Sequence, residues 1–440
     1  MKKTKEIWTG IESTRMPGKR NSNLRNSYYW EKYRDDLCCF KEMGIRTIRH
    51  PAPWDEMQKK RGEIDFTWMD EVMAVCLELG IRPVIDFVHH TAFSARLLPK
   101  GFLNPNFPQL HTEFVVAFAQ RYPWVTDFTL CNEPYVTAHL CGEVGEWYPY
   151  ARGEETFVKM VINMSKAICA TTQALSKIRN DIRFIHTDSC ESWQALEPEN
   201  RRVADAVAFV NQKRFLVDDL ILGKIDCHHP LYPYLERNGF TQDDTYWFQD
   251  NPARMDMRGL DYYRQSEWIV WEEDGRLHRR WSEHPRGLAE IVQDYVEHDP
   301  SVGFGITETN FFGTVEEQIT WLRYTLEQTE LLEEMGIPIA AFTWYPGLDS
   351  VGFQHMMVSN KKVVDPVGLV KLAVKKRQTR HPTQLTTIYA QVARGEISAK
   401  DIPICEFDPV HGPQMPGFMK LLRRSAERQA TPILPEMAIL

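Results

Sequence analysis

Two glutamates directly follow apolar runs of the kind that form buried strands. Glu133 follows the apolar part of DFTLCNEP, and Glu308 lies in GFGITETN. A pair of opposed carboxyl groups suits cleavage of a glycosidic bond, in which one group protonates the leaving oxygen and the other attacks the anomeric carbon or activates water. Each glutamate has a plainer interpretation as a helix N-terminal charge, which the helix dipole favours.

The residues at other strand ends separate these interpretations. A catalytic pair requires cations, amides and aromatic rings around it, whereas two isolated helix-terminal charges require nothing there. The sequence supplies such side chains after other strand-like runs: Arg49, His89, Asn132, Tyr263 and Trp344. Glu12, after the first run, is a further candidate for binding sugar hydroxyls. His90, Asp188, Glu191 and Trp193 are weaker candidates for the same cleft. This company favours a functional site.

The elements that would position these residues alternate along the chain. Strand-like runs lie at 6–12, 45–54, 81–90, 125–134, 182–188, 257–265, 303–310 and 338–347. Helical spacing of apolar residues lies between them, at 30–43, 68–79, 110–121, 154–179, 200–221, 285–298 and 315–335. Repeated strand and helix units predict an α/β fold, a (β/α)8 TIM barrel, in which catalytic groups come from the C-terminal ends of the strands.

Glycines mark several of the predicted joints. MGIRTI, LGIRPV and MGIPIA each place a glycine after a helix and before a strand, at Gly44, Gly80 and Gly336, as expected for helix C-caps. The pattern is least regular between 190 and 258, where DCHHPLYPYL is either a loop or an additional strand. We predict a barrel over 1–378 and a proline-rich C-terminal extension over 379–440 that packs on it.

Composition limits the partners. The 440 residues carry a formal net charge of −8 and 12% aromatic residues, with 13 Trp. This balance argues against nucleic acid or an anionic membrane as the partner and favours a neutral, stacking ligand such as a carbohydrate. The nine cysteines form no C-x-x-C pair, and no run is long and apolar enough to cross a membrane, so we expect a cytoplasmic protein with reduced thiols.

The catalytic motifs resemble those of the glycoside hydrolase family 1 β-glycosidases. TLCNEP is similar to the family's TLNEP, which implies that Glu133 is the general acid/base and that Asn132 binds the sugar 2-hydroxyl. ITETN is similar to ITENG, which implies that Glu308 is the nucleophile. IRHPAPW resembles YRFSISW at Arg49, the arginine that contacts the nucleophile.

Three further motifs extend the resemblance in the same order. VIDFVHH resembles VTLYHW and implies that His89 binds the sugar 3-hydroxyl. GLDYYRQ is similar to GLNYYT, so that Tyr263 would orient the nucleophile, with Asp261 in place of the usual asparagine. FTWYPGLD resembles FVWSLLDNFEW and implies that Trp344 is the platform under the sugar. The matches span roughly 340 residues.

The sequence also departs from the family's pattern. Glu12 stands where the family has a glutamine for the 3- and 4-hydroxyls, and it fits a barrel-end salt bridge equally well. DSVGFQH lacks the Glu-Trp pair that holds the 4- and 6-hydroxyls, and residues 379–440 are foreign to the family. The resemblance therefore implies a cofactor-free retaining β-glycosidase that acts on the ends of small β-glycosides or oligosaccharides. It leaves the sugar, its linkage and the oligomeric state open.

Two alternatives remain. A metal-dependent barrel hydrolase is suggested by histidines near strand ends, namely His89, His90, His186 with Asp188, and His228 with His229. The first strand, however, lacks the His-x-His pair that begins many metal-site barrels, so we expect no metal. A sugar-binding or transglycosylating barrel is the other alternative. Binding alone requires no opposed carboxylates, but a transglycosylase would use the same residues as a hydrolase.

Overall fold

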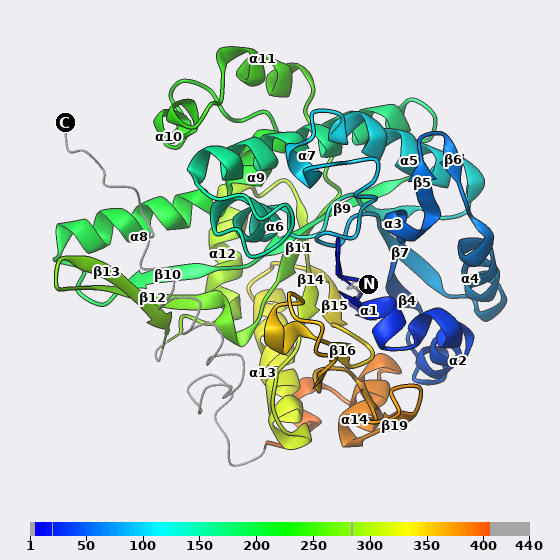
Figure 1. The fold of residues 1–440 in the computed structure, drawn as a ribbon. Coiled ribbons are helices and arrows are strands. Elements are labelled where there is room, and N and C mark those ends of the chain that lie inside the picture. Colours follow the sequence, from blue (N-terminus) through cyan, green and yellow to red (C-terminus); the bar gives the residue numbers. More distant parts are fainter. Residues whose placement is uncertain (1–4, 20, 283–284, 405–440) are drawn as a thin grey trace.

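Eight parallel strands form a closed barrel at the centre of the molecule, with helices around it (Figure 1). The computed structural model describes residues 5–19, 21–282 and 285–404. The barrel strands are β1 (Glu6–Gly10), β4 (Thr47–Pro51), β7 (Arg82–Asp86), β8 (Asp127–Thr129), β9 (Arg183–Ser189), β11 (Met257–Asp261), β14 (Gly303–Thr309) and β15 (Ile339–Trp344). Each pairs with its neighbours along the chain, and β15 closes on β1. The predicted (β/α)8 barrel is confirmed.

The helices alternate with these strands as the apolar spacing predicts. The longer helices are α2 (Tyr29–Glu42), α4 (Thr67–Leu79), α5 (Phe107–Arg121), α7 (Glu154–Ser176), α8 (Arg201–Lys213), α12 (Leu288–His298) and α13 (Val315–Glu334). Shorter helices are α1 (Asn23–Asn26), α3 (Trp54–Met57), α6 (Pro134–Ala138), α9 (Leu216–Ile221), α10 (Tyr232–Arg237) and α11 (Gln242–Asp250). The segment predicted as one helix over 200–221 is divided into α8 and α9.

The predicted joints between helix and strand carry the expected glycines. Gly44, Gly80 and Gly336 have φ values of 90°, 61° and 84°. A side chain would make this left-handed conformation costly, so glycine allows the helix to end and the next strand to begin within one or two residues.

The hydrophobic core has two parts. Inside the barrel, Trp8, Val84, Ile185, Met257 and Ala341 form a buried cluster contributed by five different strands. A larger cluster fills the space between the outside of the barrel and the helices. Buried on both faces, the strands have no free surface, and only their ends are available for function.

A small sheet of three strands stands beside the barrel next to α8 (Figure 1). It consists of β10 (Ser192–Ala195), β12 (Glu267–Glu273) and β13 (Arg276–Trp281). Its hairpin turns at Asp274 and Gly275, both with positive φ (51° and 72°). We did not predict this sheet, although Asp-Gly between two runs of alternating residues is a strong hairpin signal.

Further strands of two or three residues pair in antiparallel two-stranded sheets. They are β2 (Arg15–Met16) with β3 (Asn21–Ser22), β5 (Gln58–Lys60) with β6 (Glu63–Ile64), β16 (Ser350–Val351) with β17 (Val364–Asp365), and β18 (Val370–Leu372) with β19 (Arg380–Pro382). The uncertain stretch 226–235 contains a turn and the first part of α10, and no strand.

The described part of the predicted C-terminal extension packs on the barrel. Helix α14 (Gln384–Ala393) contacts β1 and α13, and its Tyr389 is buried. The Tyr389 hydroxyl donates to the carbonyl of Trp8 at 2.5 Å and accepts from the backbone N–H of Trp344 at 3.0 Å. It thus bridges the first and last strands. Residues 405–440 of the extension lie outside the described residues. In the ranges that the structure describes, no helix combines the length and apolar character needed to cross a bilayer.

Candidate active site

A cavity of about 340 Å³ is lined by both glutamates of the predicted pair. Glu133 follows β8 and caps the N-terminus of α6, and Glu308 is the penultimate residue of β14. Both side chains are largely buried, with 8% and 3% of their surface exposed. The fourth and seventh barrel strands therefore deliver their carboxyl groups to the same cavity, as the sequence predicts.

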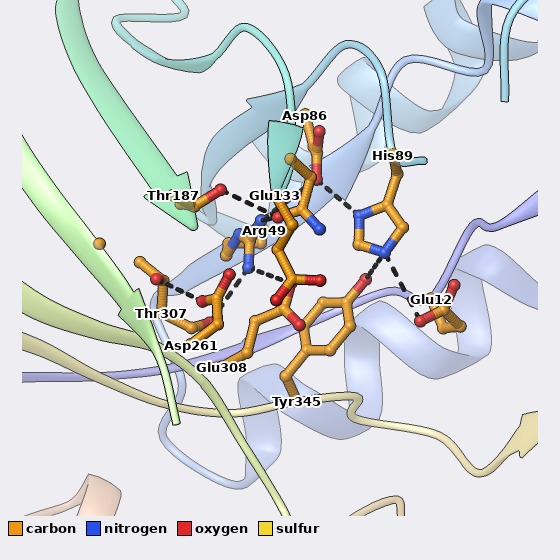
Figure 2. Close-up of polar contacts among 12 residues, drawn as sticks. Glu12, Arg49, Asp86, His89, Glu133, Thr187, Asp261, Thr307, Glu308 and Tyr345 are labelled. Atoms are coloured by element: carbon orange, nitrogen blue, oxygen red, sulfur yellow. Dashed lines mark hydrogen bonds and ion pairs between the residues drawn. The ribbon is translucent and has the colours of Figure 1, made fainter. Parts of the chain in front are cut away.

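Glu308 accepts hydrogen bonds from two side chains, of which Figure 2 labels Arg49. Arg49 Nη1 donates to Oε1 at 2.6 Å, and the Tyr263 hydroxyl donates to Oε2 at 2.7 Å. Although burial opposes it, the charges of Glu308 and Asp86 raise the pKa of Arg49 above its usual range. A permanent cation and a hydroxyl donor both favour the carboxylate form of Glu308. This arrangement suits a nucleophile.

Arg49 also positions the amide of Asn132. Its Nη2 donates to Asn132 Oδ1 at 2.6 Å and to Asp86 Oδ2 at 3.2 Å. Thr187 donates to the same amide oxygen at 2.9 Å. The amide orientation is therefore determined, and Asn132 Nδ2 has no hydrogen-bond partner among the described residues. This N–H group is buried, and Asn132 is not among the residues that line the cavity, so its contact with a sugar hydroxyl stays a prediction.

Glu133 has an unusual backbone and an altered acidity. Its φ of 42° and ψ of 58° are left-handed, which non-glycine residues rarely adopt, and its N–H donates to the Thr187 carbonyl at 3.1 Å. Burial and the like charges of Asp261 and Glu308 raise the pKa of Glu133 well above its usual range. Glu133 is therefore the carboxyl of the pair that keeps its proton, as a general acid requires.

The separation of the carboxyl groups bears on the stereochemistry. One oxygen each from Glu133, Glu308 and Asp261 lies within 4.8 Å of the other two. Retaining glycosidases have carboxyl groups about 5–5.5 Å apart, whereas inverting enzymes need about 6.5–9.5 Å to admit a water molecule. The two carboxyl groups are therefore near enough to act on one glycosidic bond, which both mechanisms require. Asp261, which the resemblance treats only as a replacement for asparagine, adds a third carboxyl.

Glu12 and His89 form a polar group beside this pair (Figure 2). His89 Nδ1 lies 2.8 Å from Asp86 Oδ2, and its Nε2 lies 3.6 Å from Glu12 Oε2 and 3.3 Å from the Tyr345 hydroxyl. Although burial opposes it, Glu12 and Asp86 raise the pKa of His89 well above its usual range. His89 in turn lowers the pKa of Glu12 to about 2 against the effect of burial. Glu12 lines the cavity, whereas His89 contacts the wall residue Tyr345.

Trp344 is not in the position expected of a sugar platform. Its side chain is fully buried and its indole N–H donates to the Val367 carbonyl at 2.9 Å. The next residue, Tyr345, lines the cavity instead. Successive side chains point to opposite faces of a strand, so one residue at the end of β15 decides which aromatic ring reaches the ligand. The motif alone does not reveal this.

The outer wall of the cavity is rich in side chains that the sequence did not single out. Aromatic and aliphatic residues dominate it, including Trp147, Trp268, Phe353, Leu140 and Met356. His90, Glu191 and Trp193, the weaker candidates, are also on the wall, whereas Asp188 is not among the lining residues.

The three-stranded sheet also contributes to this wall. Trp193 and Trp268 stack with ring centroids 5.3 Å apart, and the Arg279 guanidinium lies 4.7 Å from the centre of the Trp268 ring. All three line the cavity, since β10, β12 and β13 carry them to its mouth. The hairpin signal at Asp274 and Gly275 would have placed Trp268 and Arg279 on adjacent strands.

The histidines behind the metal alternative are dispersed. His186 pairs with Asp218 at 3.1 Å and His229 with Asp219 at 3.1 Å, whereas His90 Nε2 faces Glu133 at 3.7 Å. In the described ranges, the residues close enough to share one ion are the three carboxyls Glu133, Asp261 and Glu308. A metal site built on the histidines is therefore not supported.

The fold and the site together define a TIM barrel with a buried pair of glutamates at the ends of its fourth and seventh strands. No protein-family model and no curated protein match the chain. Among solved structures, the chain is similar to a family 1 β-glucosidase from Thermotoga maritima, with a TM-score of 0.75, 15% identity, and coverage of 88% of this chain and 96% of the other.

Complexes of β-glucosidase from the same organism give similar values. The structure with deoxynojirimycin has a TM-score of 0.75 at 14% identity, covering 90% of this chain and 98% of the other. The structure with azafagomine has a TM-score of 0.73 at 15% identity, covering 89% and 97%. At such identities the likeness establishes the shared barrel fold, and the chemistry must be argued from the site.

Proposed function

We propose that this protein is a retaining β-glycosidase of the family 1 type, acting on a carbohydrate substrate. The observation that carries the proposal is that the surroundings of the two glutamates favour opposite protonation states. Glu308 receives two donors that favour its charged form, and Glu133 lies in surroundings that favour its protonated form. The β-glucosidases of similar fold support the proposal.

In the first step, the Glu308 carboxylate attacks the anomeric carbon while Glu133 gives its proton to the leaving oxygen. The bond to the leaving group breaks, and a covalent glycosyl-enzyme forms at Glu308. In the second step, Glu133 removes a proton from water, and the resulting attack on the anomeric carbon releases Glu308. Glu133 can exchange roles because the charge of Glu308 is absent from the intermediate, which lowers the proton affinity of Glu133.

The remaining site residues have positioning and binding roles in this proposal. Arg49 and Tyr263 orient Glu308, and the free N–H of Asn132 binds a sugar hydroxyl. Glu12 and Tyr345 line the cavity on the side of His89, so we assign them to the sugar's other hydroxyls and ring face. The aromatic outer wall suits the leaving group, because rings stack on sugar and aryl faces.

Covalent labelling tests the proposal directly. Incubation with a panel of 2-deoxy-2-fluoro β-glycosides should add one glycosyl mass to the intact protein, and peptide mapping should place it on Glu308. The sugar that labels fastest identifies the specificity. Label on another residue, or inversion of configuration in the released sugar by NMR, would contradict the assignment.

A Glu308→Ala variant provides the kinetic counterpart. Without a nucleophile, turnover should fall at least about 10³-fold, because the covalent route is lost. Azide or formate should partly restore cleavage of activated glycosides by entering the space left by the carboxylate. Glu333→Ala removes a partly exposed salt bridge with Lys5. This control variant should retain full activity.

A further inference from the structure

Asp261 is a buried carboxyl that the two-glutamate mechanism does not use. It is the last residue of β11 and is fully buried. Thr307 Oγ1 donates to its Oδ1 at 2.6 Å, but its Oδ2 has no hydrogen-bond partner within the described part of the chain. A carboxylate oxygen buried without a donor is costly, whereas a carboxylic acid can place its own O–H there.

The charges around Asp261 are already unbalanced. Within this buried group, the acids Glu308, Asp86 and Glu12 face the two cations Arg49 and His89. Glu133 and Asp261 would add two more negative charges without bringing another cation.

Among the described residues with the largest charge effects on Asp261, Arg49 supplies the positive charge, whereas Glu308 and Asp188 are acids. Arg258, on the same strand, is engaged by Asp218 on α9 at 2.8 Å. The other titratable groups that act on Asp261 or are acted on by it are Glu133 after β8, Asp188 and Cys190 at the end of β9, Glu308 on β14, Arg49 on β4 and Tyr263. Of these, only Arg49 is cationic, and Glu308 is its closest partner at 2.6 Å.

We propose that Asp261 is a positioning residue that carries a second proton in the catalytic site, so that three clustered carboxyls share two protons while Glu308 is charged. In the same direction, burial and the charge of Glu308 raise the pKa of Asp261 well above its usual range. This inference rests on the proposed function for its catalytic meaning, although the protonation itself does not.

A neutral Asp261 makes the second catalytic step possible. Glu133 must lose its proton once Glu308 is glycosylated, and a permanent anion within 4.8 Å would oppose that loss. When Asp261 is an acid, the only charge that changes near Glu133 is that of Glu308. With Asp261 neutral, the pKa of Glu133 therefore depends on whether Glu308 is charged or glycosylated.

Thermal unfolding as a function of pH tests the proton without requiring turnover. If a carboxylic acid keeps its proton only in the folded protein, the free energy of unfolding falls as pH rises. The fall extends from the pKa of the acid in the unfolded chain towards its higher pKa in the folded protein. Asp261→Asn removes this loss, so its melting temperature should exceed that of the parent by an amount that grows between pH 4 and pH 8. A difference that stays constant or falls over this range would overturn the proposal.

Asp219→Asn is the matched control. Asp219 is also a buried aspartate, but it accepts from His229 and His298, and although burial opposes it, these bonds lower its pKa. Its asparagine variant should therefore lose stability relative to the parent above pH 4, which is the opposite sign. If the parent cleaves no β-glycoside, the proposed function fails, but this comparison still decides the state of Asp261.

A second variant covers the case in which Asp261→Asn does not fold. Thr307→Val removes the hydroxyl that stabilises the ionised form of Asp261 while keeping the shape of the side chain. The alkaline fall of kcat/KM should move to higher pH by a measurable fraction of a unit. If the pH of the alkaline fall in kcat/KM were unchanged in Thr307→Val, the proposed proton on Asp261 would be contradicted.

A cation could neutralise the same three carboxyls in place of a proton. Calcium or magnesium chloride would then raise the melting temperature of the parent, EDTA would reverse the effect, and Asp261→Asn would abolish it. We expect neither salt nor EDTA to change the melting temperature or the activity. The cation-dependent result would overturn the proton assignment.

Discussion

The acid/base role that we propose for Glu133 depends on a proton that its surroundings favour. Burial and the like charge of Glu308 keep the pKa of its carboxyl high. The proposed mechanism requires a protonated Glu133, so kcat/KM should fall as pH rises through the raised pKa of Glu133. A profile of kcat/KM against pH without an alkaline fall would contradict this role.

Replacing Glu133 by glutamine should remove proton donation while preserving shape. We expect kcat/KM for alkyl β-glycosides to fall about 10²–10⁴-fold. The fall should be much smaller for dinitrophenyl glycosides, whose leaving group departs without a proton, and the alkaline limb for these substrates should disappear. Equal losses for both leaving groups would exclude an acid role for Glu133.

Arg49 joins the nucleophile, Asn132 and Asp86 through one buried guanidinium. Arg49→Met would leave buried carboxylates without their cation, which costs about 3–5 kcal/mol in unfolding free energy for comparable pairs. Urea denaturation measures this loss, and activity should fall with it. Arg61→Met, which removes a surface salt bridge with Glu113, should change stability little. Similar stabilities for the two variants would contradict the structural role of Arg49.

At the scale of elements, helix ends determine where each strand begins. Gly336 ends α13 with φ of 84°, and an added Cβ would meet no atom within 4 Å. The cost of Gly336→Ala is therefore purely conformational, and we expect about 1 kcal/mol lower unfolding free energy. Gly303→Ala is the control, because its φ is not in the positive range and its Cβ would meet only the Asp256 carbonyl, at 4.0 Å. An equal effect at both glycines would refute the conformational explanation.

The three-stranded sheet outside the barrel forms part of the cavity wall. Residues of β10, β12 and β13 bring Trp193, Trp268 and Arg279 to the cavity wall. The proposed catalytic groups lie at the ends of barrel strands, whereas this part of the wall lies on an accessory sheet. The proposed catalytic residues and the proposed leaving-group surface are thus carried by separate elements, which allows one to vary while the other is retained.

At the scale of the whole molecule, the C-terminal helix α14 joins the barrel where its first and last strands meet. The hydroxyl of Tyr389 bonds to Trp8 on β1 and Trp344 on β15. Tyr389→Phe leaves these two buried backbone groups without that partner, so the unfolding free energy should fall by about 1–3 kcal/mol.

The measurement is the urea midpoint together with kcat/KM at low temperature. Activity should remain, because Tyr389 does not line the cavity. Tyr246→Phe, in which the ring is 53% exposed, should leave the midpoint nearly unchanged. A Tyr389→Phe midpoint equal to that of the parent would show that the helix contributes no bridge between β1 and β15.

Local patterns were sufficient for the barrel and for the position of both glutamates. The periodicity of apolar residues that indicates a strand or a helix depends on residues close together in the chain. In a parallel barrel, the C-terminal ends of all strands lie at the same end, so residues there come close together. Glu133 and Glu308 are 175 positions apart in the chain, yet closure of the barrel brings their oxygens within 4.8 Å. The sequence also led us to expect Arg49 and Tyr263 beside Glu308, and both side chains donate hydrogen bonds to its carboxyl group.

Only the tertiary structure decided which side chains reach the cavity and which hold protons. Tyr345 lines it and Trp344 does not, because a one-residue difference at the end of β15 reverses the direction of a side chain. The state of Asp261 depends on burial, on an oxygen without a donor among the described residues, and on charges from β4, β9 and β14. Such quantities arise from distances between residues far apart in the chain, whereas a sequence motif records only residue type and spacing.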